Sequence, residues 1–427
     1  MKKRKVAFHN LGCKVNSYET EAMQQILEQR GYEIVPFEDD SADVYIINTC
    51  TVTNIADRKS RQMLHRAKKM NPRAVVVAVG CYAQAAGEKL KDDSAVDIVV
   101  GNNQKKEIAD ILEEYFLKQE EKTCRILDIG HTGEYEGLSI ARTAEHTRAY
   151  IKVQDGCTQF CSYCIIPYTR GRVRSRDMQD VIKEVRTLAA AGYQEVVLTG
   201  IHLSSYGTDR KDGSDLLALI EAVHKTEGIR RIRLGSLEPR IITEEFAGRL
   251  SELPKICPHF HLSLQSGCDE TLKRMNRRYT TKEYYEKCLL LRKYFSSPAL
   301  TTDVIVGFPG ETEEEFAATV EFLKKVQFYE THVFKYSRRQ GTRAASMENQ
   351  VPEKIKNERS RCLLALNEEN KKAYEQSFSG KTVEVLFENR ITVDGKEVYA
   401  GHTKEYIMVT VPAGPENLVN KIKDCIL

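Results

Sequence analysis

Residues 149–164, AYIKVQDGCTQFCSYC, join a strand-like apolar run to three closely spaced cysteines. Cys157, Cys161 and Cys164 form a C-x3-C-x2-C pattern directly after the predicted strand. A structural zinc site normally uses four ligands in paired short spacings, and no adjacent Cys or His supplies a fourth. Three thiolates instead fit a 4Fe-4S cluster that leaves one iron open to an exogenous molecule. A zinc knuckle and three incidental cysteines are the alternatives.

Downstream of this stretch, strand-like and helix-like segments alternate. Strand-like runs include EVVLTG (195–200) and LTTDVIVG (300–307), and QDVIKEVRTLAAAG (179–192) is one of the amphipathic segments between them. Such alternation predicts parallel strands joined by helices. Six βα units, two fewer than a complete barrel, predict a partial, open TIM-like (β/α)6 barrel over residues 148–372. Its chemistry is expected at the carboxyl ends of the strands, where the three cysteines lie.

A second group of cysteines lies in residues 1–120, which also read as a βαβ series with a parallel sheet. Cys13, Cys50 and Cys81 each follow an apolar run, in HNLGC, IINTC and VAVGC. One such cysteine is typically a small buried apolar side chain. Because strand carboxyl ends share one edge of a parallel sheet, three together predict a second metal site. Gly80, before Cys81, would then let the backbone approach a bulky cluster closely.

The remaining segments complete the predicted organisation. Residues 121–147 lack strong periodicity and are predicted to be a linker, and after a charged helix residues 373–427 are predicted to form a small all-β domain. No apolar run reaches the roughly 20 residues of a membrane helix. The basic start lacks a secretory apolar segment, so the twelve cysteines are expected in the reducing cytoplasm. The net charge of +3 is only mildly basic, so any nucleic-acid binding is expected to depend on local clusters of basic residues.

Together, these motifs resemble two nested families. The C-x3-C-x2-C pattern at the first strand of a partial barrel resembles the radical S-adenosylmethionine (SAM) superfamily. GCKVNSYE (12–19), NTCTVT (48–53), GCYAQ (80–84) and GCTQFCSYCIIPYTRGRVRSR (156–176) resemble the methylthiotransferase family across essentially the whole chain. The resemblance implies an N-terminal methylthiotransferase domain with an auxiliary 4Fe-4S cluster, a radical-SAM core with its own 4Fe-4S cluster, and a C-terminal RNA-binding TRAM domain.

The resemblance also implies a reaction. Within the family, the strings look most like the bacterial branch that converts N(6)-threonylcarbamoyladenosine at position 37 of tRNA, next to the anticodon, to its 2-methylthio derivative. Two SAM molecules per turnover would then serve as methyl donor and radical source. The implied partners are a tRNA anticodon stem-loop, a sulfur donor, and an electron donor, either a small protein such as flavodoxin or a chemical reductant. Neither a membrane nor DNA is an expected partner.

Further site residues follow from the same resemblance and from local charge. The expected SAM-binding residues lie at later strand ends or between the cysteines, and each has a plain alternative as a polar loop residue; they are Tyr163, Gly200, Glu238, Ser263 and Gln265. The expected RNA-binding residues come from basic clusters, whose usual role is a solvated face; they are Arg170, Arg172, Arg338, Arg339 and Arg343. KRMNRR (273–278), with Arg274 and Arg277, is another such cluster.

Rival functions remain open from sequence. The same chemistry could act on N(6)-isopentenyladenosine of tRNA or on an aspartate of a small-subunit ribosomal protein. From a different class, the chain could be a non-catalytic RNA-binding protein whose cysteines hold zinc. The C-terminal β segment could be a plain stabilising module. Neither a P-loop nor the motifs H-E-x-x-H and G-x-S-x-G occur, which disfavours nucleotide hydrolysis and serine-triad catalysis.

Overall fold

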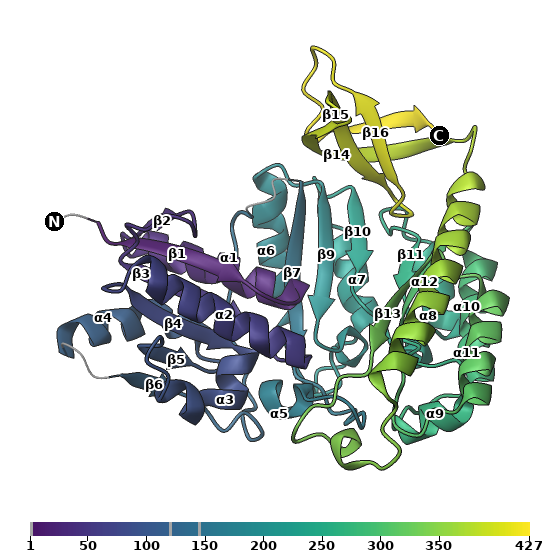
Figure 1. Ribbon diagram of the computed structural model, residues 1–427. Helices are drawn as coiled ribbons and strands as arrows, with labels where there is room; N and C mark the ends of the chain where they lie inside the picture. The colour runs from purple at the N-terminus through teal and green to yellow at the C-terminus, as the bar shows by residue number, and fades with distance from the viewer. Residues whose placement is uncertain (1–2, 119–121, 144–146) are drawn as a thin grey trace.

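A computed structural model describes residues 3–118, 122–143 and 147–427. Figure 1 shows an N-terminal α/β part, a larger central α/β part beside it, and a small C-terminal β sheet at one end of the central strands. Helices and strands thus alternate in the first two parts, as the sequence predicts. Among the described residues, no helix combines the length and the apolar character needed to cross a membrane.

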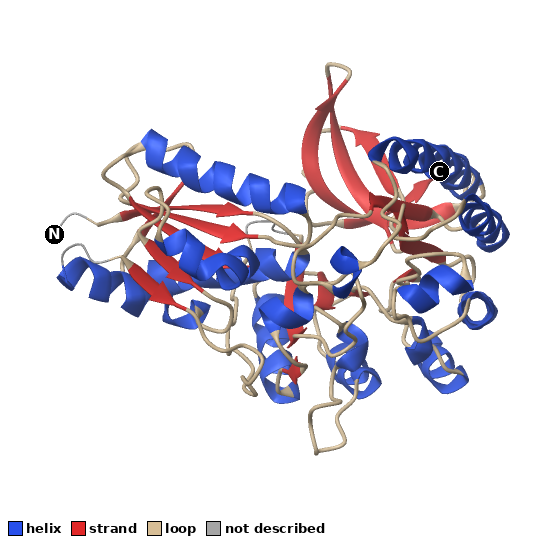
Figure 2. Ribbon diagram, turned by 60° about the horizontal axis from the view of Figure 1, so that its bottom comes forward, coloured by secondary structure: helices blue, strands red, loops and turns tan. Residues whose placement is uncertain are grey.

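The N-terminal part is built on a parallel sheet of six strands in the order β2-β1-β3-β4-β5-β6. The strands are β1 (Lys5–Asn10), β2 (Glu33–Val35), β3 (Val44–Thr49), β4 (Val75–Gly80), β5 (Ile98–Val100) and β6 (Thr123–Arg125). The connecting helices are α1 (Lys14–Gln29), α2 (Asn54–Met70), α3 (Cys81–Lys91), η1 (Lys105–Glu107) and α4 (Ile108–Lys118). Figure 2 shows helices on both sides of these strands.

Two apolar clusters hold these layers together. On one face of the sheet, Leu27 of α1 and Leu112 of α4 pack with the strand residue Val77. On the other face, Leu64 of α2 packs with Val76, the neighbour of Val77 along β4. Successive strand residues point to opposite faces, so a sheet covered on both sides needs the continuous apolar runs that the sequence contains.

The segment predicted to be a linker contains a strand that the sequence analysis did not identify. Thr123–Arg125 forms β6 and pairs in parallel with β5. Further along, Leu138 and Ile140 are buried against the central core. Three residues are too few to give a periodic signal, so β6 escaped prediction. At the edges of the predicted linker, residues 121 and 144–146 lie outside the described part of the chain.

The central part places six parallel strands side by side in the order β7-β9-β10-β11-β12-β13. They are β7 (Arg148–Asp155), β9 (Glu195–Gly200), β10 (Arg231–Leu234), β11 (His259–His261), β12 (Ala299–Val306) and β13 (Glu330–Lys335), with the short antiparallel β8 (Arg174–Ser175) beside β7. Isolated parallel bridges join β10 to the segment around β11. The helical elements are α5 (Ile166–Arg170), α6 (Met178–Ala190), η2 (Leu203–Ser205), α7 (Leu216–His224), η3 (Pro239–Ile241), α8 (Glu244–Ser251), α9 (Asp269–Arg274), α10 (Thr281–Tyr294), α11 (Glu313–Val326), η4 (Arg343–Ser346) and α12 (Glu353–Gln376).

The C-terminal part is an antiparallel sheet in the order β16-β15-β14-β17. Its strands are β14 (Thr382–Val393), β15 (Lys396–Thr403), β16 (Met408–Pro412) and β17 (Ile422–Ile426). Helix α12 runs to Gln376, past the boundary predicted at residue 373. Arg231, at the start of β10, donates to the Glu384 carbonyl at 2.7 Å. The sheet therefore docks at the amino ends of the central strands, opposite the end where Cys157 follows β7.

Candidate active site: two cysteine triads

The first candidate site is the N-terminal triad, which we define as Cys13, Cys50 and Cys81. Each cysteine directly follows one of the three adjacent parallel strands β1, β3 and β4, or the short turn after it. A Cβ built on Gly12 would lie 3.2 Å from the Cys50 Sγ, so the turn bearing Cys13 approaches Cys50 closely. The structure thus brings the three cysteines to one edge of the sheet.

The backbone conformation at Gly80 and its contact with β3 both favour glycine at this edge. Its φ of +94° is a conformation that residues with a Cβ rarely adopt. A Cβ would also lie 2.4 Å from the Asn48 Oδ1 and 2.8 Å from the Thr49 carbonyl oxygen. The Gly80 backbone therefore lies close to the neighbouring strand β3. Cys81, the next residue, begins helix α3 directly after β4.

The surrounding protein affects the Cys13 and Cys50 thiols of the N-terminal triad. Burial raises the pKa of the Cys13 thiol, while the Arg170 cation opposes that rise. Burial likewise raises the pKa of Cys50 to about 11, and the neighbouring thiols of Cys81 and Cys13 add to the effect. Cys13 is exposed to solvent, so the triad is accessible from the Cys13 side. A bound metal ion would have to displace the thiol protons, as coordinating thiols require.

The second candidate site is the loop triad, which we define as Cys157, Cys161 and Cys164. It occupies the loop between β7 and α5. The loop is held by backbone hydrogen bonds from Cys164 N to Cys161 O (3.0 Å) and from Cys157 N to Gly171 O (2.9 Å). Burial raises the pKa of Cys157 to about 11 and that of Cys164 to about 12.

Arg277 contacts the loop triad, and sequence analysis did not predict this contact. The Arg277 Nη1 donates to the Cys161 Sγ at 3.3 Å, and its Nε donates to the Tyr279 hydroxyl at 2.9 Å. Arg277 belongs to the basic stretch KRMNRR, which the sequence suggested as an RNA contact. The structure instead directs its guanidinium toward a cysteine. A basic cluster in sequence does not reveal which of its members turn inward.

The five expected SAM-binding residues lie at the same end of the central strands as the loop triad. Gly200 ends β9, and Glu238 caps η3, where its carboxylate accepts from the Arg240 Nε at 2.8 Å. The carbonyl of Ser263 accepts from the Tyr279 hydroxyl at 2.6 Å, which links it to Arg277. Gln265 has a φ of +74°, and Tyr163 packs edge-on against Phe308.

His202 is a further polar residue in this region that sequence analysis did not single out. It follows β9 and its Nδ1 lies 2.6 Å from the Ser205 hydroxyl. Burial, together with the cations of Arg277 and Arg240, lowers the pKa of His202 to about 4. Its Nε2 is buried without a hydrogen-bond partner in the part of the chain that the structure describes. The only signal was a histidine two residues after a strand-end glycine, which is too common to select.

Two of the five arginines expected to bind RNA are buried, which corrects the sequence analysis. Arg170 has no exposed surface and is bonded to the Glu19 and Asp155 carboxylates. Arg339 is 7% exposed and pairs with the Asp57 carboxylate at 2.6 Å. Both guanidinium groups have internal anions and are not available to phosphates. The other three, Arg172, Arg338 and Arg343, are exposed.

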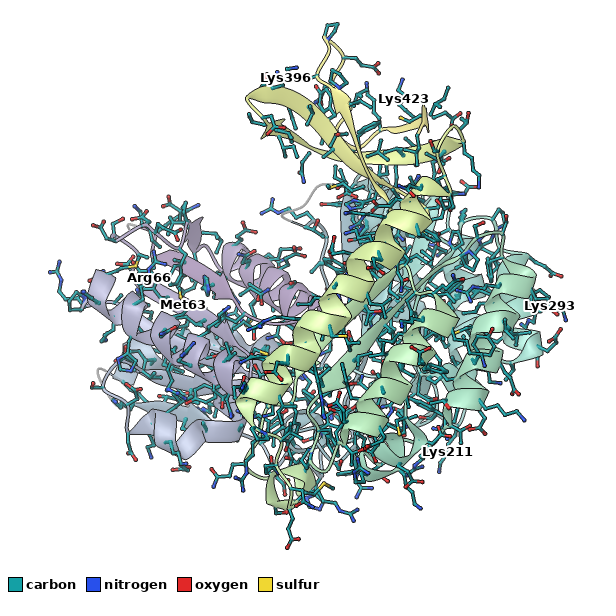
Figure 3. All side chains as sticks on the ribbon, turned by 45° about the vertical axis from the view of Figure 1, so that its right-hand side comes forward. Met63, Arg66, Lys211, Lys293, Lys396 and Lys423 are labelled. Carbon is teal, nitrogen blue, oxygen red and sulfur yellow. The ribbon has the colours of Figure 1, made fainter. Side chains whose placement is uncertain are left out.

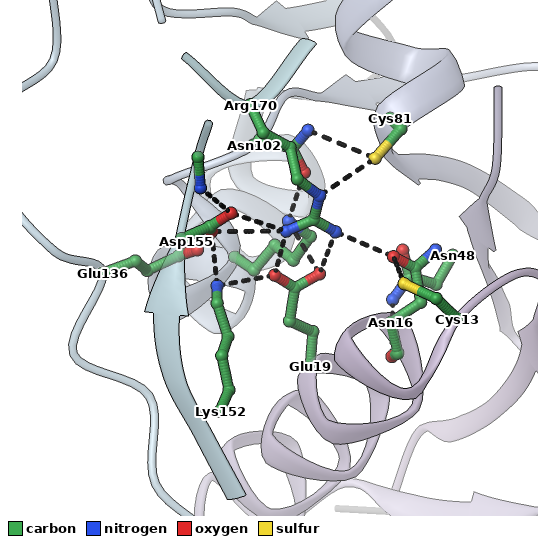
Figure 4. Close-up of polar contacts among 12 residues, drawn as sticks. Cys13, Asn16, Glu19, Asn48, Cys81, Asn102, Glu136, Lys152, Asp155 and Arg170 are labelled. Carbon is green, nitrogen blue, oxygen red and sulfur yellow. Dashed lines mark hydrogen bonds and ion pairs between the residues drawn. The ribbon is translucent and has the colours of Figure 1, made fainter. Parts of the chain in front are cut away.

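Arg170 links the central part to the N-terminal triad (Figure 4). It ends α5, and its Nε donates to the Cys81 Sγ at 3.2 Å. Its Nη2 donates to the Asn16 Oδ1 at 2.8 Å. The same Oδ1 lies 3.8 Å from the Cys13 Sγ. The contact could not be predicted because Arg170 and Cys81 are far apart in sequence.

The donor chemistry of both triads fits an iron–sulfur cluster with one iron free of protein ligand. Each triad offers three cysteine thiols, the ligand type that such clusters use. Among the described residues, the group whose three ligand atoms all lie within 4.8 Å of one another is His261, Asp303 and His332, on β11, β12 and β13. Neither cysteine triad meets this 4.8 Å limit.

Two family models match the chain. One described as the radical SAM superfamily matches residues 151–323, which include the loop triad. Another, described as uncharacterized protein family UPF0004, matches residues 5–101, which include the N-terminal triad. A solved structure of the radical S-adenosylmethionine methyltransferase TsrM from Kitasatospora setae aligns with a TM-score of 0.58 at 17% identity, covering 78% of this chain and 73% of that one. The structural likeness supports the fold alone.

Curated relatives match nearly the whole chain. The threonylcarbamoyladenosine tRNA methylthiotransferase MtaB of Bacillus subtilis is 44% identical over 98% of this chain and 92% of its own length. The protein of the same name from Aquifex aeolicus is 43% identical over 91% of this chain and 95% of its own. A tRNA-2-methylthio-N(6)-dimethylallyladenosine synthase of Moorella thermoacetica is 37% identical over 96% and 93%. The chain therefore belongs to the radical-SAM methylthiotransferase family, in its MtaB-type branch.

Proposed function

We propose that this chain is the tRNA methylthiotransferase that converts N(6)-threonylcarbamoyladenosine at position 37 to its 2-methylthio derivative. The observation that carries the proposal is the pairing of two three-cysteine sites on adjoining sheets, in a chain 44% identical to a relative of that name. Carbon 2 of adenine bears a C–H bond without useful acidity and without a leaving group, so acid–base or nucleophilic side chains have little effect on it. Radical chemistry is suited to such a bond.

The cofactors proposed are two 4Fe-4S clusters and SAM. Cys157, Cys161 and Cys164 would hold the radical-SAM cluster, and Cys13, Cys50 and Cys81 the auxiliary cluster. When bound, the first cluster and SAM supply a 5′-deoxyadenosyl radical, the auxiliary cluster supplies sulfur, and a second SAM supplies the methyl group. Five strand-end and loop residues are proposed to bind SAM: Tyr163, Gly200, Glu238, Ser263 and Gln265.

This division assigns a role to each part of the chain. Residues 1–120, extended by β6, would form the methylthiotransferase domain, and residues 148–372 the radical-SAM core, whose six strands we interpret as a partial (β/α)6 barrel. The segment 121–147 connects them. Residues 373–427 would form a TRAM domain, with its sheet beginning at Thr382. Within this arrangement the chain's own task is to hold the two three-cysteine sites. Arg170, at the end of the helix that follows Cys164, contacts the Cys81 sulfur of the N-terminal triad.

RNA binding would use exposed cations and the C-terminal sheet. Arg172, Arg338 and Arg343 are exposed and available to phosphates of an anticodon stem-loop. Lys396 and Lys423 project outward from the C-terminal sheet (Figure 3). The remaining partners proposed are a sulfur donor and an electron donor such as flavodoxin or a chemical reductant.

Nucleoside analysis of tRNA tests the substrate. In a strain that lacks the gene, the 2-methylthio derivative of threonylcarbamoyladenosine should disappear while that of isopentenyladenosine persists. A plasmid copy should restore the missing nucleoside, and a copy with Cys157→Ala should not. Loss of the methylthio-isopentenyl nucleoside instead would support the substrate named for the relative in Moorella thermoacetica.

Metal analysis tests the rival class, a non-catalytic zinc protein. After anaerobic reconstitution, about eight irons per chain are expected for two cubane clusters. The reduced protein should then convert SAM to 5′-deoxyadenosine. Zinc without charge-transfer absorption, together with no cleavage of SAM, would contradict the proposed function.

A further inference from the structure

A buried group of charges beside Cys81 has more cations than carboxylates. All members are 0–1% exposed and joined by ion pairs of 2.6–3.7 Å. The cations are Arg170, Arg174, Lys105 and Lys152, and the carboxylates are those of Glu19 and Asp155. Buried charge is strongly unfavourable unless it is compensated. Within this ion-paired group four cations face two carboxylates, so positive charge is available to stabilise a neighbouring electron-rich atom.

Arg170 is the cation of this group that reaches a sulfur. Its Nη1 lies 2.8 Å from the Glu19 Oε1 and 3.1 Å from the Asp155 Oδ1. These bonds fix the guanidinium plane, and the Nε on its remaining edge donates to the Cys81 Sγ at 3.2 Å. Asn102 Nδ2 lies 3.6 Å from the same sulfur and holds it from a second side. The Cys81 sulfur is therefore the acceptor that the Arg170 Nε and the Asn102 Nδ2 share.

Arg170 also occupies a particular place in the chain. Helix α5 (Ile166–Arg170) begins two residues after Cys164 of the loop triad and ends at Arg170. One short helix therefore joins a cysteine of one triad to the hydrogen-bond donor of the other. A rigid guanidinium suits this role better than a flexible ammonium because its several donors are fixed in one plane.

We infer that Arg170 is a positioning residue that holds the Cys81 sulfur of the auxiliary cluster and sets the reduction potential of that cluster. The inference rests on the proposed function, in which Cys81 is a cluster ligand. A hydrogen bond and a positive charge at a ligand sulfur stabilise the more negative, reduced cluster, and hydrogen bonds to sulfur and net charge are established determinants of cluster potential. Glu19, a carboxylate of the same buried group, acts in the opposite direction.

The test measures the potential of the auxiliary cluster alone. Full-length protein with Cys157, Cys161 and Cys164 all changed to Ala retains only the N-terminal triad, and is reconstituted with iron and sulfide. EPR-monitored redox titration then compares Arg170→Gln, Arg170→Lys and Glu19→Gln with the unchanged background. Arg172→Gln is the matched control, because it removes an exposed arginine two residues away.

Opposite shifts are the expected result. Arg170→Gln should lower the potential, Glu19→Gln should raise it, and Arg172→Gln should leave it unchanged. Arg170→Lys should give a smaller shift than Arg170→Gln, because the charge is kept and the fixed donor to Cys81 is lost. Equal potentials for Arg170→Gln and Arg172→Gln at equal iron content would overturn the inference. If Arg170→Gln does not fold, shifts of the same sign in Arg170→Lys and Glu19→Gln would overturn it.

The failure of the proposed function has a different signature. In that case the background protein would bind no iron before any change at Arg170, and the auxiliary cluster itself would be rejected. Folding of Arg170→Gln is expected, because the Glu19 and Asp155 carboxylates keep Lys152 as a shared partner at 2.7 and 2.6 Å. Circular dichroism and iron content check this directly.

Discussion

The two cysteine triads are built in contrasting ways. The loop triad lies within one stretch of chain between β7 and α5, and its arginine, Arg277, bonds to the neutral Tyr279 hydroxyl and the Ser263 carbonyl. The N-terminal triad gathers residues from three strands, and its arginine is fully buried among carboxylates. Local chain geometry thus forms the first site, whereas tertiary structure and buried charge form the second. Substitutions in the two triads should therefore have different effects.

The largest difference in activity between the two triads is expected when one cysteine of each is replaced. Cys157→Ala should abolish both SAM cleavage and methylthiolation, whereas Cys81→Ala should abolish methylthiolation and leave 5′-deoxyadenosine formation. Each protein should lose up to about four irons per chain. Cys268→Ala, at a cysteine of no assigned chemistry, is the control and should change neither activity nor iron. Loss of SAM cleavage in Cys81→Ala would contradict the separation of roles.

A second test concerns the fold that carries Cys81. Gly80→Ala should cost at least about 3 kcal/mol of unfolding free energy, because it adds overpacking against β3 to the cost of a positive φ. Gly31→Ala is the matched control, since Gly31 has a φ of +86° but no atom within 4 Å of its Cβ position. It should cost only about 1 kcal/mol in urea unfolding. Equal costs at the two glycines would show that close approach to β3 is unimportant.

The same contrast explains what the sequence could predict. The loop triad and the strand-end cysteines are visible because ligand type and strand periodicity are local properties. Arg170 and Arg277 were read as surface charge, because nothing local distinguishes a solvated arginine from one whose partners are distant in sequence. Strand β6 was missed because its pairing with β5 depends on tertiary structure rather than on its three residues. Sequence therefore selected the cysteines and the strand-end loops around them, but it did not reveal the arginines that contact their sulfurs.

A smaller effect is expected at the arginine of the loop triad. Arg277→Gln removes a charged hydrogen bond to the Cys161 sulfur, worth about 1.5–3 kcal/mol. If that bond supports the reacting geometry, the rate of 5′-deoxyadenosine formation should fall about tenfold or more. Arg278→Gln, at the exposed neighbour, should leave the rate unchanged. A normal rate in Arg277→Gln, or an equal fall in Arg170→Gln, would remove the distinction between the two arginines.

The smallest expected effect is a pH dependence of folding stability that arises at His202, near the loop triad. His202 has its pKa lowered to about 4 by burial and by Arg277 and Arg240, against about 6.5 in an unfolded chain. The unfolded state thus binds the proton more tightly, so stability is complete above about pH 6.5 and falls as the pH approaches 4. Near the N-terminal triad, by contrast, the pKa of Glu19 lies well below its usual value, despite burial, because of Arg170 and two lysines.

His202→Asn isolates this contribution, because asparagine keeps a polar group near Ser205 but does not titrate. Between pH 7.5 and pH 5.5 the unchanged protein should lose about 1.3 kcal/mol more unfolding free energy than the variant. Urea unfolding at the two pH values measures the difference. Parallel losses in both proteins would mean that His202 takes up its proton equally well in the folded and unfolded states. The pH dependence would then have to arise elsewhere, and the loop-triad side would be no more sensitive to protons than the buried ion pairs around Arg170.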